Sequence, residues 1–111
     1  MNVYRLPSSS TATQLFFDEL ADHISALITS SSQAVVVCGD LSCQGDTSNT
    51  IDNRLAATFY ALNMTQLVRS PTRHNSLLDV LACSDDGKFV QDVVIDDAGG
   101  VSDHRLVKAQ F

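Results

Sequence analysis

The sequence has few aromatic residues and few positive charges. Its 111 residues include no Trp, and aromatic residues make up only 6% of the chain. The core must therefore be built from aliphatic side chains, which the 44% share of hydrophobic residues can supply for one modest domain. The same share excludes a chain that stays disordered for lack of apolar surface.

Positive charge is scarce, because seven Lys and Arg residues stand against thirteen Asp and Glu residues, for a net charge of −6. Affinity for nucleic-acid phosphates comes from Lys and Arg, so the composition argues against a non-specific nucleic-acid binder. Two interpretations of the acidic side chains remain. Either they form a solvated surface, or some of them converge on a metal ion that supplies the positive charge.

Long apolar runs are also missing. No run approaches the roughly 18 apolar residues of a membrane span, and the first residues lack the apolar centre of a secretory signal, so we expect no membrane partner. The three cysteines, Cys38, Cys43 and Cys83, form no C-x-x-C pair, and their odd number argues against a disulfide framework or a zinc site. Reduced thiols are typical of an intracellular chain, nuclear or cytoplasmic.

Hydrophobic periodicity predicts a succession of strands and helices. Helices are expected at residues 11–29 and 51–63, each with apolar side chains at three- and four-residue steps. Strands are expected at residues 2–5, 34–38, 64–69, 77–83, 89–96 and 105–111. This order predicts an α/β chain with α+β layers, a mixed sheet and two main helices.

Acidic residues end or interrupt these predicted strands. Asp40 follows the β-branched run AVVVC, in a loop punctuated by glycine. Asp79 stands inside the apolar run LLDVL, where a carboxylate is costly unless it is paired, hydrogen-bonded or bound to a metal. The alternative is an edge strand on which Asp79 faces water. The dipeptide Asp103–His104 precedes the last strand, and by itself it is weak evidence for a site.

Five segments, taken in order, resemble signatures of the endonuclease/exonuclease/phosphatase superfamily. They are NVYRLPSSS, a strand followed by GDLS, SPTR, the strand NSLLDVL, and SDH before a strand. YRLP and PTR resemble the endonuclease domains of LINE-type retrotransposons, the non-LTR reverse transcriptase proteins. The resemblance covers almost all of this chain but only the C-terminal half of the family's domain. It implies that residues 1–111 are half of a four-layer α/β/β/α sandwich whose N-terminal half is missing, which would leave an apolar sheet face exposed.

The resemblance also implies catalytic roles for particular residues. Tyr4 would contact the scissile phosphate, and Asp40 would orient or deprotonate the attacking water. Ser42 stands where the family has an Asn, and its hydroxyl offers one donor where an amide offers two. Asp79 would support the metal site or the leaving group.

Asp103 and His104 would complete this catalytic set. Asp103, which is also a candidate metal ligand, would fix the tautomer of His104, and His104 would hydrogen-bond a phosphate oxygen. The family's cofactor is Mg²⁺ or Mn²⁺, and the implied activity is hydrolysis of a phosphodiester in DNA. The family's main metal ligand, a Glu in the N-terminal half, has no counterpart here. We therefore expect the 111 residues alone to nick DNA weakly or not at all.

Three other interpretations remain open. The loop that begins at Asp40 resembles the start of an EF-hand calcium site, although Ile51 stands where a chelating Glu is required. Ser42, His104 and an Asp are the residue types of a serine hydrolase, although the sequence has no GxSxG elbow. The third interpretation is a non-catalytic remnant or interaction module of the same fold.

Overall fold

The structure is a computed structural model that describes residues 1–5, 10–30, 33–47, 49–84, 88 and 90–111. Over these residues the elements follow one another as α1 (Ser10–Ser30), β1 (Val36–Asp40), α2 (Asn53–Ala61), β2 (Thr65–Gln66), β3 (Asp79–Cys83), β4 (Asp92–Asp96) and β5 (Leu106–Gln110). The prediction of a mixed α+β chain with two helices is confirmed. Phe89, the first residue of one predicted strand, lies outside the described residues.

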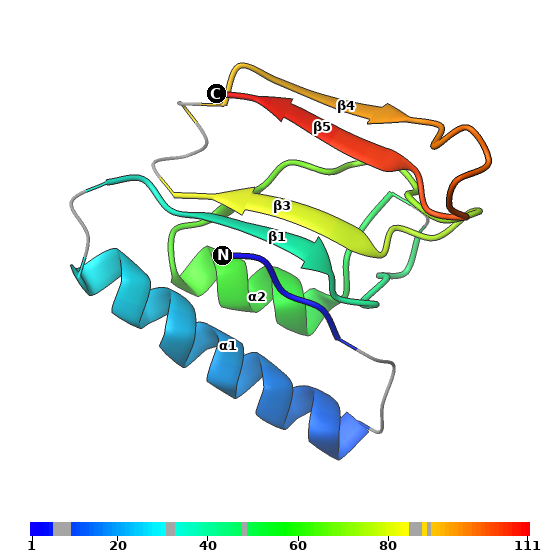
Figure 1. Ribbon diagram of the computed structural model, residues 1–111. Helices are drawn as coiled ribbons and strands as arrows, with labels where there is room; N and C mark the ends of the chain where they lie inside the picture. Colours follow the sequence, from blue (N-terminus) through cyan, green and yellow to red (C-terminus); the bar gives the residue numbers. More distant parts are fainter. Residues whose placement is uncertain (6–9, 31–32, 48, 85–87, 89) are drawn as a thin grey trace.

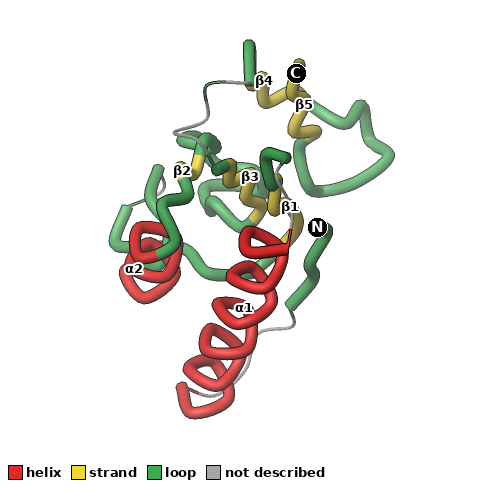
Figure 2. The backbone as a smooth tube through the Cα atoms, turned by 90° about the vertical axis from the view of Figure 1, so that its left-hand side faces the viewer, coloured by secondary structure: helices red, strands yellow, loops and turns green. Residues whose placement is uncertain are grey.

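The elements stack in three layers, as Figures 1 and 2 show. Both helices cover one face of a three-stranded sheet in the order β1-β3-β2, and the hairpin β4–β5 lies over the other face. All of these strand pairs are antiparallel, where a mixed sheet was expected, and a parallel contact occurs in the isolated bridge from Asn2 to Cys38. The register of β1 on β3 places Asp40 opposite Asp79, at the end of β1 and the start of β3.

The core lies between the helices and the three-stranded sheet. α1 contributes Phe17, Leu20 and Ile24, which recur at three- and four-residue steps, and α2 contributes Leu55 and Phe59. β3 is the central strand, and its last four residues are all buried. Each large side chain buried in this way contributes roughly 1.5–3 kcal/mol relative to an exposed position.

The first predicted strand, residues 2–5, forms only a single parallel bridge from Asn2 to Cys38. Its backbone still docks on β1, because the amide of Val3 donates to the carbonyl of Cys38 at 2.8 Å. Gly39 makes this approach possible, since a Cβ at its position would collide with the Val3 backbone. The start of the chain is thereby held beside the end of β1.

Several other elements are shorter than the sequence predicts, and for two of them the cause is a side chain. The strand expected at residues 64–69 is reduced to β2, because the Gln66 side chain takes over the pairing: its Oε1 accepts from Val68 N at 2.7 Å and from Leu81 N at 3.3 Å. The helix expected from residue 51 begins at Asn53 instead. The reason is Asp52, whose carboxylate accepts from the amide of Arg54 at 2.8 Å and caps the helix.

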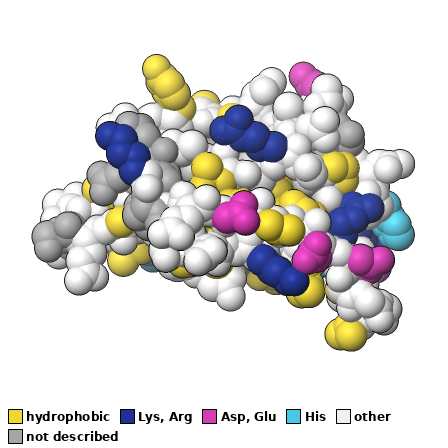
Figure 3. Space-filling model, turned by 90° about the horizontal axis from the view of Figure 1, so that it is seen from above, with side chains coloured by type: hydrophobic (Ala, Val, Ile, Leu, Met, Phe, Trp, Pro, Cys, Tyr) yellow, Lys and Arg dark blue, Asp and Glu magenta, His cyan; other side chains and the backbone are white. Residues whose placement is uncertain are grey.

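The sheet face that points away from the helices is only partly covered. Between this face and the hairpin runs a groove of about 870 Å³, and its apolar lining includes Val36, Cys38, Val107 and Ala109. Figure 3, which looks onto the hairpin side, shows hydrophobic side chains at the surface between separate acidic and basic ones. Within the described part of the chain, no helix combines the length and the apolarity that crossing a membrane requires.

Candidate functional site

A tight turn after β1 sets the direction of the Asp40 carboxylate. Ser42, two residues on, has a positive φ of 51°. In this conformation the amide and the hydroxyl of Ser42 both donate to Asp40 Oδ1, each at 3.0 Å. Both bonds engage Oδ1, and the other oxygen, Oδ2, is the one that lies toward His104.

Asp79 begins β3 and is the register partner of Asp40. Two like charges directly opposite each other in an antiparallel sheet are destabilising. Only 19% of the Asp40 side chain and 20% of the Asp79 side chain are exposed, so water screens the repulsion only in part. A positive charge between the two carboxylates would therefore be favourable.

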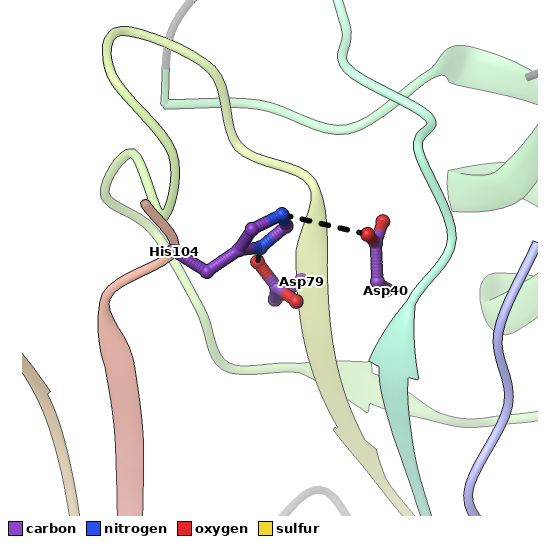
Figure 4. Close-up of side chains that lie close together, drawn as sticks. All are labelled: Asp40, Asp79 and His104. Carbon is purple, nitrogen blue, oxygen red and sulfur yellow. Dashed lines mark hydrogen bonds and ion pairs between the residues drawn. The ribbon is translucent and has the colours of Figure 1, made fainter. Parts of the chain in front are cut away.

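His104 occupies this position (Figure 4). It projects from the segment before β5, with Nδ1 2.7 Å from Asp79 Oδ2 and Nε2 3.7 Å from Asp40 Oδ2. Ligand atoms of the three residues all lie within 4.8 Å of one another. The structure thus brings together four of the six residues that the resemblance singles out, because Ser42 is hydrogen-bonded to Asp40, and the acidic and imidazole groups of the other three face one another. We call these three residues the Asp40–Asp79–His104 cluster.

Thr72 fixes the backbone on two sides of the cluster. It is fully buried, and its Oγ1 accepts from the amides of Leu78 at 3.1 Å and Asp79 at 3.0 Å. Its carbonyl oxygen accepts from the amide of Arg105 at 2.5 Å. One residue therefore ties the start of β3 to the segment that carries His104.

Asp103 does not contact His104 as the resemblance implies. Its carboxylate accepts a hydrogen bond from Arg73 Nε at 2.7 Å, in an ion pair that is exposed on both sides. The Arg73 guanidinium holds the pKa of the Asp103 carboxyl below its ordinary value. The expectation that Asp103 orients the imidazole is wrong, because Asp79 is the carboxylate on Nδ1.

The backbone of Tyr4 lies beside the end of β1, since the amides of Val3 and Arg5 donate to the carbonyls of Cys38 and Asp40. Tyr4 is 67% exposed, and within the described residues no hydrogen bond or ion pair joins it to Asp40, Asp79 or His104. Its neighbour Arg5 is the residue that turns toward the Asp40 loop, through hydrogen bonds to the carbonyls after Asp40. A role for Tyr4 at a phosphate stays a prediction.

Two rival chemistries find no support in this geometry. The Ser42 hydroxyl donates to Asp40 and not to His104, so the relay of a serine hydrolase is not assembled. In the calcium-loop alternative, Gln44 should offer an oxygen to the ion, yet its Oε1 accepts from the amide of Leu77 at 3.0 Å. Ile51, at the position of the chelating Glu, is buried in the core.

The donor set of the cluster fits a divalent cation. Carboxylate oxygens suit Mg²⁺ and Mn²⁺, and an imidazole nitrogen shifts the preference toward Mn²⁺ and other transition metals. Since Asp79 Oδ2 and His104 Nδ1 engage each other, Asp40 Oδ2 and His104 Nε2 are the atoms that would hold the ion. A carboxylate behind a metal-binding histidine is a recurrent arrangement in metal sites.

Two residues that shape the site, Arg5 and Thr72, have no local signal in the sequence. Both stand inside the matched segments YRLP and SPTR, but their roles depend on hydrogen bonds to other segments, which for Arg5 lie 36 and 37 residues along the chain. The roles of Arg5 and Thr72 could be predicted only from knowledge of which distant segments contact each other. Comparisons of the chain with protein-family models, with curated proteins and with solved structures found no match.

Proposed function

We propose that the Asp40–Asp79–His104 cluster is the acid–histidine part of a divalent-metal phosphodiesterase site that acts on DNA. The observation that carries the proposal is the imidazole between two register-paired carboxylates, 2.7 Å from Asp79 and 3.7 Å from Asp40. Acids and histidines gathered at strand ends are a common basis of hydrolytic sites. The resemblance of YRLP and PTR extends the proposal to DNA nicking by a LINE-type element.

Each residue of the cluster has a separate part in this proposal. Asp79 holds a proton on Nδ1 of His104, so that Nε2 is the nitrogen free to bind a cation or, when protonated, to donate to a phosphate oxygen. Asp40 offers Oδ2 beside it, as a cation ligand or as the acceptor of a proton from the attacking water. When bound, Mg²⁺ or Mn²⁺ would supply positive charge to the phosphate and the leaving oxygen.

Metal binding is the first test. In a ¹⁵N-labelled chain titrated with Mn²⁺, we expect paramagnetic broadening to appear first at the amides around Asp40, Asp79 and His104. Asp79→Asn should weaken Mn²⁺ binding by about 10-fold or more, because it removes the carboxylate behind the imidazole. His104→Ala should weaken it further. Asp92→Asn is the control, since Asp92 is an exposed carboxylate on β4. Broadening that centres on Asp92 or spreads over all surface carboxylates would sink the proposal.

Plasmid nicking is the second test. With Mg²⁺ or Mn²⁺ we expect slow nicking of supercoiled DNA or none, because the cluster offers the cation only one carboxylate and one imidazole directly, and Ser42 replaces an amide. Any nicking should disappear in His104→Ala and persist in Asp92→Asn. Nicking that survives His104→Ala would locate the activity elsewhere.

The second candidate function is a non-catalytic interaction module. The observation that favours it is the apolar groove of about 870 Å³ between the sheet and the hairpin, which no described segment fills. A chain that binds neither Mn²⁺ nor DNA would leave this candidate as the better one.

A further inference from the structure

A single arginine outside the cluster contacts three consecutive carbonyls of the turn that carries Asp40. The backbone amide of Arg5 donates to the Asp40 carbonyl at 2.9 Å. Its side chain donates through Nε to the Leu41 carbonyl at 2.8 Å and through Nη2 to the Ser42 carbonyl at 3.1 Å. Hydrogen bonds from a charged donor are stronger than neutral ones, and the planar fork of Arg fixes the angle between its acceptors.

The guanidinium is itself supported by the helical layer. Its central carbon lies 5.7 Å from the ring centroid of Phe16 on α1, within cation–π range. Phe16 in turn packs edge-on against Phe17, with centroids 5.9 Å apart, and Phe17 is a core residue only 1% exposed. Arg5 therefore links the turn, through Phe16, to the buried core.

The turn needs such support because its own conformation is unfavourable. Ser42 has a φ of 51°, in the left-handed region that side chains other than Gly, Asn and Asp seldom adopt. If this turn relaxed, the two bonds from Ser42 to Asp40 Oδ1 would break, and Oδ2 would lose its direction toward His104. The position of the Asp40 carboxylate thus depends on the conformation of the Ser42 backbone. That conformation is held by Arg5, which donates to the Ser42 carbonyl.

We propose that Arg5 is a positioning residue: it holds the turn at residues 40–42 and thereby aims Asp40 Oδ2 at the point that it shares with His104 Nε2. The inference rests on the proposed function, because the point in question is the cation position. Arg5 touches neither the reacting atoms nor the cation in this role. Its effect reaches the site only through Asp40.

The test compares Arg5→Lys with a matched change at Arg54. Lys keeps the charge but lacks the fork that binds two carbonyls. Arg54 is also an arginine stacked on an α1 aromatic ring, 5.4 Å from the Phe17 centroid, but its side chain pairs with Asp52 and not with the carbonyls of residues 40–42. Two quantities are measured at a temperature where all variants are folded: the hydrogen-exchange rate of the Ser42 amide without metal, and the Mn²⁺ affinity from paramagnetic broadening.

In Arg5→Lys we expect Ser42 exchange to accelerate about 10-fold and Mn²⁺ affinity to fall by a similar factor, while Arg54→Lys changes neither. The loss of affinity should vanish when Arg5→Lys is made in an Asp40→Asn background, because the effect passes through Asp40. Accelerated exchange with unchanged Mn²⁺ affinity would overturn the proposal and leave Arg5 a purely structural residue.

The two proposals fail in different ways. A wild-type chain that binds no Mn²⁺ while its Ser42 amide stays protected overturns the proposed function, and the positioning role falls with it. A wild-type chain that binds Mn²⁺ at the cluster, with an affinity that Arg5→Lys leaves intact, overturns the positioning role alone. Both proposals stand if affinity and exchange change together in Arg5→Lys but not in Arg54→Lys.

Discussion

At position 42, both the backbone conformation and the expected chemistry of the site favour an Asn side chain. Its φ of 51° lies in the left-handed region, where Asn is several-fold enriched over most residues. The chain already uses Asn in this way, because Asn63 has a φ of 56° just beyond α2. The endonuclease/exonuclease/phosphatase signature that GDLS resembles has Asn as its last residue. A short amide side chain therefore suits both the turn and the site.

We predict that Ser42→Asn raises the free energy of unfolding by about 0.5 kcal/mol, whereas Ser42→Val lowers it by about 1–2 kcal/mol because a β-branched side chain crowds the left-handed backbone. Denaturant unfolding measures both changes. Ser70→Asn is the control, since Ser70 is exposed and its φ is not positive. An equal effect of Asn at both positions would show that the turn conformation is not the cause.

The thiols give a prediction about pH. Burial raises the pKa of the Cys43 thiol, although the charge of Arg5 opposes the shift, and burial also raises the pKa of Cys83. A raised pKa in the folded state means that unfolding releases a proton once the pH passes the ordinary value of 9.0. Stability should therefore be unaffected by these thiols below about pH 8, and should fall as the pH rises through 9 and beyond.

Alkylation kinetics and alkaline unfolding together measure this behaviour. In the native chain we expect Cys38, which lines the groove, to react first, and the two buried thiols to react fully only in denaturant. Cys83→Ala should reduce the steepness of the stability loss above pH 9, because it removes one of the two thiols whose pKa is raised by burial. Three equally fast thiols in the native chain would contradict the burial on which the pKa shifts depend.

The sequence indicated which residues form the cluster more reliably than it indicated which of them contact each other. Asp79 stood out because a carboxylate inside LLDVL needs a partner, and the structure supplies His104 at 2.7 Å. The resemblance implied that Asp103 orients His104, whereas the Asp103 carboxylate contacts Arg73 instead. Arg5 could not be assigned, since its acceptors are backbone carbonyls that have no signature in a sequence.

At the scale of elements, the segment before β3 depends on Thr72. Its single hydroxyl oxygen accepts from two backbone amides in a fully buried position. Thr72→Val keeps the shape of the side chain but removes the hydrogen-bond acceptor. We predict that it lowers the free energy of unfolding by about 2 kcal/mol or more, because the amides of Leu78 and Asp79 are left unpaired. Thr72→Ser should restore most of the loss.

Thr29→Val is the control for this series. The Thr29 hydroxyl donates to the Ser25 carbonyl on the exposed side of α1. Thr29→Val should therefore change the free energy of unfolding by no more than about 0.5 kcal/mol. Thermal or chemical denaturation of the three variants gives the comparison. If Thr72→Val proves as mild as Thr29→Val, the buried hydrogen bonds do not anchor β3.

Helices and strands were predictable where a local sequence pattern alone determines their type and length. α1 was predicted because apolar side chains recur at helical steps from Phe16 to Ile28, and it spans Ser10–Ser30 where residues 11–29 were expected. β2 was overestimated, because the hydropathy of MTQLVR does not reveal that the Gln66 side chain replaces part of the ladder. Residues 2–5 form a bridge and not a strand, an outcome that depends on docking against Gly39.

At the scale of the whole molecule, net charge bears on the DNA binding that we propose. The net charge is −6, and on the hairpin side the Lys and Arg side chains stand apart from one another (Figure 3). Two of the arginines, Arg54 and Arg73, are paired with carboxylates, as is Lys108. Without a cation the molecule should repel a polyanion, and a divalent ion at the cluster would be the main attraction.

We therefore predict that, at about 0.15 M monovalent salt, a short fluorescent DNA duplex shows no anisotropy change with the chain in EDTA and a clear one when Mn²⁺ is added. His104→Ala should abolish the Mn²⁺-dependent binding, and Asp92→Asn should preserve it, because Asp92 lies on β4 outside the cluster. Binding in EDTA that weakens steeply with salt would show that Lys and Arg side chains hold the DNA. In that case the acidic composition would have misled us about the surface, and the cluster would have no special part in recognition.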